Sequence, residues 1–159
     1  MSEPVGPTVF ERLQSRLEQT GTPYDVLRHA PVFTSEEAAA VRGVALASGA
    51  KALICKVDQR FVMFVLPADC KLDSKRARRA TNAKSLRFAS RDEVAQLTGL
   101  EPGSIPPFGS LFNLETWCEP RLGDQERINF NAGDHAISLS MRYADYLAVE
   151  QPHAEPVVS

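Results

Sequence analysis

The chain has 159 residues, of which 43% are hydrophobic and 24% charged, and its formal net charge is −2. These values are ordinary for a soluble globular domain with a buried core, and the near-neutral total neither favours nor opposes a polyanionic partner. Cys55, Cys70 and Cys118 are odd in number and widely spaced, which argues against a disulfide framework or a zinc site. The N-terminal MSEPVGPTVF lacks the basic and apolar regions of a signal peptide, and no run is long enough for a membrane helix. We therefore expect a cytoplasmic protein with reduced thiols.

The first third of the chain predicts two helices that begin with capping boxes. Thr8 with Glu11, and Thr34 with Glu37, have the spacing at which each side chain satisfies a free backbone amide of the other. A short strand leading to His29 is predicted between these helices. The centre then predicts a β-hairpin, with β-rich runs at 51–57 and 61–66. The second run is almost continuously hydrophobic, which predicts a strand covered on both faces.

The second half of the chain predicts short elements around a turn-rich loop, EPGSIPPFGS. A basic helix is predicted over 74–81, and Ser90 with Glu93 opens another helix. The remaining predicted elements are strands over 86–88, 115–118, 127–131 and 135–140, and a last helix over 142–147.

Strand pairs interspersed with helices predict one α/β (mixed α+β) domain over residues 8–149, with a central mixed β-sheet flanked by helices. A doubly wound parallel sheet is disfavoured because helices and strands do not alternate strictly. Residues 1–7 and 150–159 are rich in Pro, Ser and Glu, and we expect them to be loose tails. Neither GxGxxG nor GxxxxGK[ST] occurs, so we expect no nucleotide cofactor, and no metal is indicated.

The charge is unevenly distributed. Residues 71–91 contain eight basic side chains and one acidic one, whereas the rest of the chain has ten basic and nineteen acidic. Such a patch on an acidic body is typical of a surface that binds a polyanion. A solvated helix face tuned for solubility explains the same charges equally well.

Three places could carry chemistry. Lys51 opens a strand, where its ammonium could bind a phosphate, although a solvated strand-end lysine fits the same position. The loop 103–109 (GSIPPFG) combines two prolines with two glycines and could direct backbone amides at a carbonyl oxygen, or serve only as a turn. His135 and His29 could orient a water or a substrate group, or make structural hydrogen bonds. No serine or cysteine is paired with them in a nucleophile motif, so covalent catalysis is not expected.

Four segments stand out when taken in order: HAPVFTSEEAA at 29–39, GAKALICK at 49–56, LTG at 97–99 with GSIPPFG at 103–109, and NAGDHAIS at 131–138. In this order and spacing the chain resembles the YbaK and prolyl-tRNA synthetase-associated editing domain family, over about residues 8–149. The resemblance implies a freestanding aminoacyl-tRNA deacylase that acts in trans. Its implied partners are the acceptor end of mischarged tRNA and an aminoacyl-tRNA synthetase, with no membrane.

The resemblance also implies roles for particular residues. Lys51 matches the family's essential lysine, which holds the terminal adenosine through its phosphate. Gly103 to Pro107 matches the GxxxP loop, whose amides bind the aminoacyl carbonyl, and His135 falls where some members have a functional histidine. The implied substrate-binding residues are His29, Thr34, Ser104, Pro106, Pro107, Phe108, Gly109, Gly133 and Asp134. The implied tRNA-binding residues are Lys71, Lys75, Arg78 and Arg79.

Two departures from the family pattern bear on the amino acid removed. Many members have a second glycine in place of Ser104, and others lack the histidine. The GDH-containing turn and the PPFG loop hint at a subclass distinct from the alanine-specific members, and a small polar amino acid such as serine or threonine fits that hint. The sequence leaves alanine, serine, threonine, cysteine and other amino acids open. Two other functions stay open at this level, a non-catalytic tRNA- or synthetase-binding module and a hydrolase of small esters or thioesters. An intact Lys51 and GxxxP loop favour the deacylase.

Overall fold

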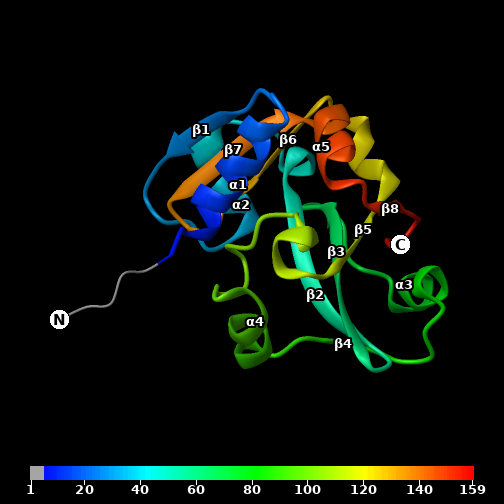
Figure 1. Ribbon diagram of the computed structural model, residues 1–159. Helices are drawn as coiled ribbons and strands as arrows, with labels where there is room; N and C mark the ends of the chain where they lie inside the picture. Colours follow the sequence, from blue (N-terminus) through cyan, green and yellow to red (C-terminus); the bar gives the residue numbers. More distant parts are fainter. Residues whose placement is uncertain (1–5) are drawn as a thin grey trace.

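The computed structural model describes residues 6–159, which form two β-sheets with helices packed around them (Figure 1). Within that range, no helix has both the length and the apolar character needed to cross a membrane. The elements are, in chain order, α1 (Val9–Gln19), β1 (Asp25–Arg28), α2 (Ser35–Arg42), η1 (Leu46–Ser48), β2 (Ala50–Val57), β3 (Arg60–Pro67), α3 (Ser74–Thr81), β4 (Leu86–Phe88), α4 (Arg91–Thr98), η2 (Gly109–Phe112), β5 (Glu115–Cys118), η3 (Pro120–Asp124), β6 (Arg127–Asn131), β7 (Ile137–Arg142), α5 (Tyr143–Glu150) and β8 (His153–Ala154).

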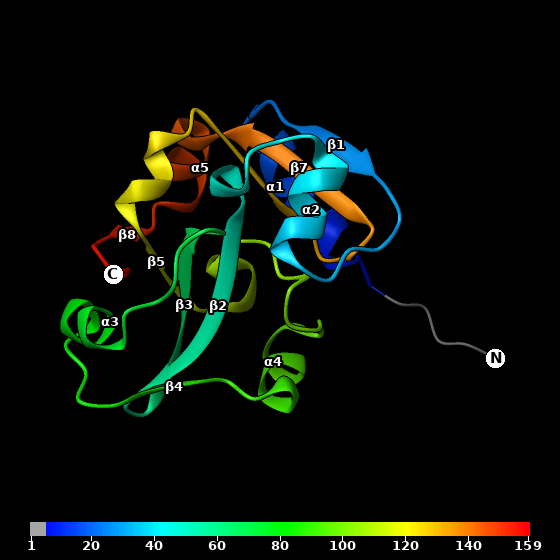
Figure 2. The same cartoon turned by 180° about the vertical axis from the view of Figure 1, so that it is seen from behind.

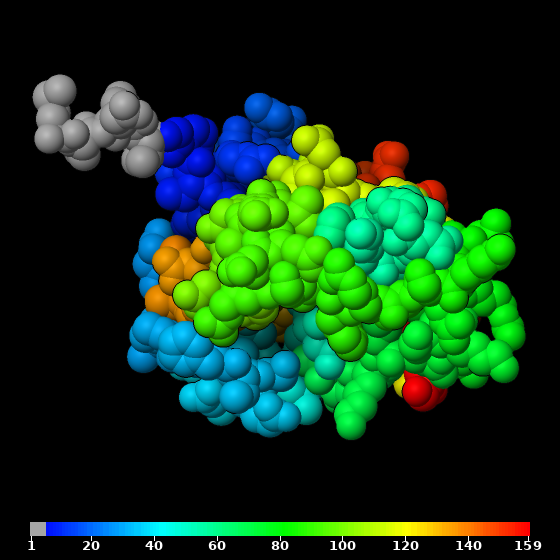
Figure 3. Space-filling model, turned by 90° about the horizontal axis from the view of Figure 1, so that it is seen from below, coloured from blue at the N-terminus to red at the C-terminus, as the bar shows by residue number. Residues whose placement is uncertain are grey.

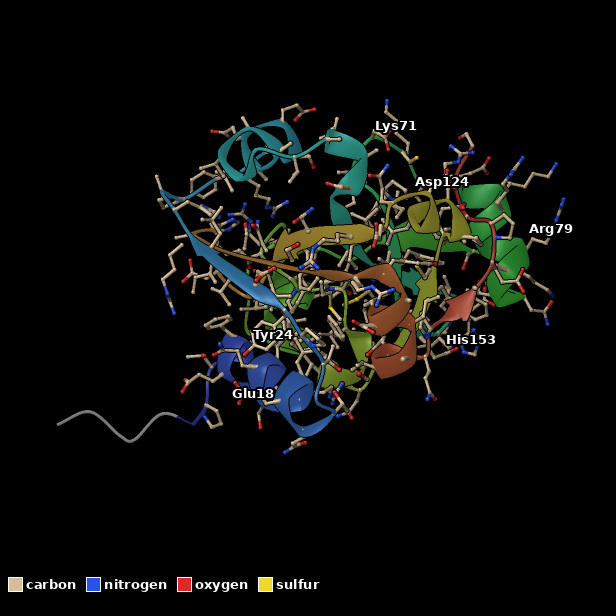
Figure 4. All side chains as sticks on the ribbon, turned by 90° about the horizontal axis from the view of Figure 1, so that it is seen from above. Glu18, Tyr24, Lys71, Arg79, Asp124 and His153 are labelled. Atoms are coloured by element: carbon tan, nitrogen blue, oxygen red, sulfur yellow. The ribbon has the colours of Figure 1, made fainter. Side chains whose placement is uncertain are left out.

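Helices α1, α2 and α4 begin with the capping boxes that the sequence predicts. In each, a threonine or serine side chain accepts a hydrogen bond from the amide three residues on, and the glutamate there accepts one from the cap's amide. These bonds satisfy amides that the first helical turn leaves without partners. The three pairs are Thr8 with Glu11, Thr34 with Glu37, and Ser90 with Glu93. The hydroxyl of Tyr24 ties α1 to the start of β1 by donating to Glu18 at 3.0 Å (Figure 4).

The larger sheet is mixed and has the strand order β4-β2-β3-β5-β8. Strands β2 and β3 form the predicted antiparallel hairpin, in which Lys51 lies opposite Leu66, while β5 runs parallel to β3. Strands β1, β7 and β6 form a second, antiparallel sheet, joined to the first by an isolated bridge between Gly49 and Asn129. The predicted mixed α/β fold is confirmed, and its strands divide between two sheets.

Strand β3 is covered on both faces, as its hydrophobic sequence predicts. Met63 and Val65 face the larger core cluster, which includes side chains of α1, α5 and the 105–112 segment. Val62, Phe64 and Leu66 face a second cluster, formed with α3 and the C-terminal residues. The helices α1 and α3 therefore lie on opposite sides of the β2–β3 hairpin (Figure 2).

The prediction of a loose C-terminal tail is wrong. Strand β8 pairs in parallel with β5, and Val157 and Val158 are buried. The buried carboxylate of Glu119 accepts hydrogen bonds from the amides of both valines, at 3.0 and 3.2 Å. Local composition could not reveal this packing, because the partners lie on β5 and in the loop after it. The other predicted loose tail is residues 1–7. Its first five residues lie outside the described part of the chain.

The last predicted strand and the last predicted helix both begin later than predicted. Strand β7 begins at Ile137 rather than at His135, because Asp134 Oδ1 accepts a hydrogen bond from the amide of Ala136 at 2.7 Å and holds this stretch in a turn. Helix α5 likewise begins one residue later than predicted and continues to Glu150. His135 consequently lies in the turn before β7.

Candidate active site

A cleft opens where the two sheets meet, between α2, the start of β2 and the end of β6. The cleft and its opening to solvent together span about 590 Å³, and Figure 3 shows a hollow beside the light-blue surface that includes α2. Alanine and glycine make up much of the lining, and its charged side chains are Lys51 and Arg42. No carboxylate is among the described residues that line the cleft. Lys51 and Gly103, which lie far apart in the sequence, face the same space.

Lys51 enters the cleft from the beginning of β2 and is half-buried. Burial lowers the pKa of Lys51 below its ordinary value, and nearby Lys71 lowers it further, whereas Cys70, Asp69 and Glu36 oppose this shift. Among the described residues, none forms an ion pair with its ammonium. A half-buried ammonium without a fixed partner can bind a phosphate as a point charge.

Gly103 also lines the cleft. Its φ of +90° is a conformation that side chains with a Cβ rarely adopt, so a glycine suits this position. A Cβ there would lie 3.6 Å from His135 Cε1, an ordinary contact, so the backbone angle rather than space disfavours a larger residue. The Gly103 carbonyl accepts a hydrogen bond from Asn131 Nδ2 at 2.8 Å, which holds the start of the loop.

The rest of the loop packs behind Gly103, away from the cleft. Ser104 is buried, and its hydroxyl donates to the Glu101 carbonyl at 2.8 Å while its carbonyl accepts from the amide of Gly133 at 2.8 Å. The remaining predicted loop residues, Pro106, Pro107, Phe108 and Gly109, are buried as well.

Each end of this buried segment is fixed to the core. The Tyr146 hydroxyl donates to the Pro107 carbonyl at 2.7 Å, and the amide of Gly109 donates to Thr116 Oγ1 at 3.0 Å. The ring of Phe108 packs edge-on against Tyr146, with ring centroids 5.1 Å apart. These residues support the loop from behind, and only Gly103 of the GxxxP segment lines the cleft.

His135 lies beside Gly103 but does not line the cleft. Its Nδ1 is 3.1 Å from the Val32 carbonyl, an acceptor only, so Nδ1 carries a proton and donates. Its Nε2 is 3.4 Å from Glu101 Oε2, yet the geometry there does not make a hydrogen bond, so this is a charge contact only when the ring is protonated. The ring packs against Phe33, with centroids 4.7 Å apart.

His29 begins a hydrogen-bond chain that leads to the cleft. Its Nδ1 donates to the Ala30 carbonyl at 2.8 Å, so in the neutral ring its Nε2 accepts from the Ser138 hydroxyl at 2.7 Å. Ser138 Oγ in turn accepts from Arg42 Nε at 2.8 Å. His29 is therefore connected to the cleft through Ser138 and Arg42, without lining it.

Arg42 continues the chain to the GxxxP loop. Its Nη2 donates to Asn131 Oδ1 at 2.9 Å, and Asn131 donates to the Gly103 carbonyl. Burial lowers the pKa of Arg42 to about 10. No pattern in the sequence indicates this role, because a basic residue in the last turn of a helix is common and favourable to the helix dipole.

The structure places the three remaining predicted residues, Thr34, Gly133 and Asp134, in different surroundings. Thr34 lines the cleft, but its hydroxyl already caps α2. Gly133 packs against Val9, and exposed Asp134 closes the turn before β7.

Three of the four predicted tRNA-binding residues are exposed. Lys71 lies close enough to Lys51 to affect its pKa, and Figure 4 shows Lys71 beside the segment that leads into β2. Lys75 and Arg79 are exposed on α3, with Arg79 projecting from its outer side (Figure 4). Arg78 is half-buried, and its guanidinium donates to the carbonyls of its own helix and of the following loop.

Ion pairs reduce the free charge of this basic segment. Arg87 makes a two-pronged contact with Glu93 at 2.7 and 2.8 Å, and Arg76 lies 3.8 Å from Asp73. The surface available to a polyanion is therefore smaller than the count of basic residues implies.

Known proteins resemble this chain over most of its length. The family model for the aminoacyl-tRNA editing domain matches residues 29–149. The Escherichia coli (strain K12) protein named Multifunctional Ser/Thr-tRNA deacylase ProXp-y is 36% identical over 152 residues, which cover 92% of this chain and 91% of that protein. A proline–tRNA ligase from Bacillus licheniformis is 37% identical over 92 residues, or 57% of this chain and 16% of the ligase. A solved structure described as a candidate trans-editing enzyme for prolyl tRNA synthetase shares the fold, with a TM-score of 0.84 at 24% identity, covering 98% of this chain and 99% of that one.

Proposed function

The chain belongs to the aminoacyl-tRNA editing domain family, and we propose that it is a trans-acting deacylase that hydrolyses the ester of mischarged tRNA. The family membership that the sequence motifs predict is confirmed. The observation that carries the proposal is that Lys51 and Gly103 line one cleft. Because aminoacyl-tRNA is consumed by translation, we infer that the protein acts in the cytoplasm.

Lys51 binds the substrate's end in this mechanism. Its ammonium has no fixed protein partner among the described residues, so a phosphate of the terminal nucleotide can take that place. Anchoring the phosphate positions the ester within the cleft, which replaces a random encounter by a fixed geometry. Lys51 therefore acts in binding and orientation, and not as a nucleophile or base.

Gly103 polarises the ester in this mechanism. Its amide donates to the carbonyl oxygen of the aminoacyl group and stabilises the negative charge that develops there. A water molecule attacks the carbonyl carbon, and the tetrahedral intermediate collapses with cleavage of the bond to the ribose oxygen. That oxygen takes one proton of the attacking water and leaves as the tRNA hydroxyl, while the amino acid leaves as a carboxylate and the second proton passes to solvent. The neighbouring ribose hydroxyl helps to hold the attacking water.

His135 is a positioning residue in this proposal. Its Nδ1–H is already used by the Val32 carbonyl, and its ring supports Gly103 from outside the cleft. It thus keeps the GxxxP loop and Phe33 in place.

The proposed amino acids are serine and threonine. The relative from Escherichia coli carries Ser/Thr-tRNA deacylase in its name and matches over nearly the whole chain. The cleft lining is small and partly polar, with Asn129 and Asn131 beside several alanines, which suits a small polar side chain. A cleft of this kind selects by size and by hydrogen bonding.

Deacylation of a panel of mischarged tRNAs tests the proposal. The panel contains Ala, Ser, Thr and Cys on tRNAPro, together with Ser and Thr on other tRNAs. Release of Ser and Thr is expected to be fastest. If micromolar protein released none of these amino acids, the deacylase would be refuted, and tight binding without release would instead indicate a non-catalytic tRNA-binding module.

A further inference from the structure

Arg42 presents an unused hydrogen-bonding edge at the cleft. Its Nε and Nη2 donate to Ser138 and Asn131, whereas Nη1 has no hydrogen bond to any described residue. No carboxylate of the described chain pairs with the guanidinium. Nη1 points toward the Gly49 side of the cleft, because a Cβ built on Gly49 would lie 4.0 Å from it.

This arrangement lacks a counter-ion. Both protein partners of Arg42 are neutral, and a cation withdrawn from water is stabilised when an anion pairs with it. Lys51 is the other charged side chain of the cleft lining, and no described lining residue is acidic. Asp69 and Glu36 act on Lys51 from outside the described lining. Two cations in a lining that contains no described carboxylate favour an anionic ligand, and the anions of an aminoacyl-tRNA are its phosphodiesters.

We infer that Arg42 is a second phosphate-binding residue of the cleft, and that the same guanidinium fixes Gly103 through Asn131. The inference rests on the proposed function. Arg42 Nη1 and Lys51 Nζ contact the phosphates at the 3′ end of the tRNA, while Nε and Nη2 stay on their protein partners.

The link from Arg42 to Gly103 has a fixed direction. Arg42 can only donate, so it contacts the amide oxygen of Asn131, and the amide nitrogen of Asn131 then faces the Gly103 carbonyl. If Arg42 moves, Asn131 loses the bond that sets its orientation, and the Gly103 carbonyl loses its donor. Phosphate binding and the placement of the GxxxP loop are thereby coupled through one side chain.

Four variants separate these two roles. Arg42→Gln removes the charge, and Arg42→Lys keeps the charge but loses the fork that holds Ser138 and Asn131. Asn131→Ala leaves Arg42 intact and cuts the link to Gly103. Arg127→Gln is the matched control, because it removes an equal charge from an exposed arginine of β6 that pairs with Asp25.

Two measurements apply to each variant. The first is the affinity for a 5′-labelled uncharged tRNA acceptor-stem oligonucleotide with its CCA end, by fluorescence anisotropy at several salt concentrations. The second is kcat and KM for deacylation of the substrate that the wild-type protein cleaves best. Thermal unfolding of each variant reports whether the fold is intact.

Arg42→Gln is expected to weaken oligonucleotide binding about tenfold, because a hydrogen bond to a charged group is removed. The slope of log affinity against log salt should fall by about 0.7, as for one contact to a single-stranded phosphate. Arg42→Lys should keep that slope but lose kcat, and Asn131→Ala should lose kcat with the slope unchanged. Arg127→Gln should resemble the wild-type protein in every measurement.

If Arg42→Gln folds and binds with the wild-type affinity and salt slope, Arg42 does not contact phosphate and the inference is overturned. If Asn131→Ala keeps its kcat, the coupling to Gly103 is overturned. A wild-type protein that binds the oligonucleotide but releases no amino acid refutes the deacylase alone, since the binding arm still tests Arg42.

Discussion

Substitution of Lys51 by alanine is the most direct test of the proposed mechanism. The change removes an ammonium that has no ion-pair partner among the described residues, so no buried partner is left unsatisfied. The free energy of unfolding is therefore expected to change by less than about 1 kcal/mol. The interaction removed from the phosphate is a hydrogen bond to a charged group, worth about 1.5–3 kcal/mol, which corresponds to a fall in kcat/KM of about 10- to 100-fold.

The assay is the initial rate of release of labelled amino acid from a mischarged tRNA, with the uncatalysed rate subtracted. Lys56→Ala is the matched control, because Lys56 lies on the same strand and its ammonium rests over the ring of Phe61, at 5.8 Å. The control should retain wild-type activity. If Lys51→Ala retained kcat/KM within about twofold of the wild-type value while remaining folded, the phosphate-anchoring role would be refuted.

The lowered pKa of Lys51 predicts two pH trends of opposite direction, one in the affinity for tRNA and one in the stability of the fold. Binding needs the protonated amine, so affinity for the tRNA end should fall at a pH below the ordinary lysine value of 10.5. At pH values between the pKa of Lys51 in the folded protein and its ordinary value of 10.5, the unfolded chain binds more protons than the folded one. Burial of the charged Lys51 therefore destabilises the fold at lower pH. This destabilisation is lost as the pH rises through that range. Compared with Lys51→Ala, the wild-type protein should gain stability and lose affinity over that range. Chemical unfolding and anisotropy, each measured against pH, check the two trends.

Three further predictions concern other parts of the molecule. Gly103→Ala should destabilise the fold by about 1–2 kcal/mol in urea titrations, since φ is +90° there, and should lower kcat; an unchanged kcat would separate the loop from the chemistry. The double variant Lys75→Glu, Arg79→Glu should bind full-length tRNA more weakly. Its slope of log affinity against log salt should fall by about 0.9 for each duplex phosphate that the variant no longer neutralises. An unchanged affinity would instead assign this surface to solubility. Glu119→Ala should lower the free energy of unfolding by about 3 kcal/mol, because two buried amides lose a charged acceptor, and a decrease below about 1 kcal/mol would contradict that reasoning.

The local features of the fold were predictable from the sequence because their causes are local. A capping box operates within four residues, so Thr34 with Glu37 and Ser90 with Glu93 locate their helices to the residue. The hydrophobic run of β3 likewise predicts burial on both faces. The division into two sheets and the docking of Val157 on the core depend on partners far along the chain, and no local pattern contains that information.

The candidate site was predictable only in part, for the same reason. Family motifs identified Lys51 and Gly103, and the fold brings both to one cleft. The motifs did not distinguish Gly103 from the buried loop residues that support it, such as Phe108. Arg42 could not be identified, because its importance comes from the hydrogen bonds that it makes to residues of β6 and β7.

The bridge between Gly49 and Asn129 has a consequence for how such proteins diversify. The cleft lies at the junction of two sheets, each held together by its own strand pairing. A small change in the angle between the sheets can widen or narrow the cleft without breaking either set of strand pairs. Substitutions in the core between the sheets can therefore alter which amino acids fit, although they touch neither Lys51 nor Gly103. The choice of amino acid can therefore change during evolution through substitutions far from the cleft, while the contacts of Lys51 and Gly103 with the substrate stay the same.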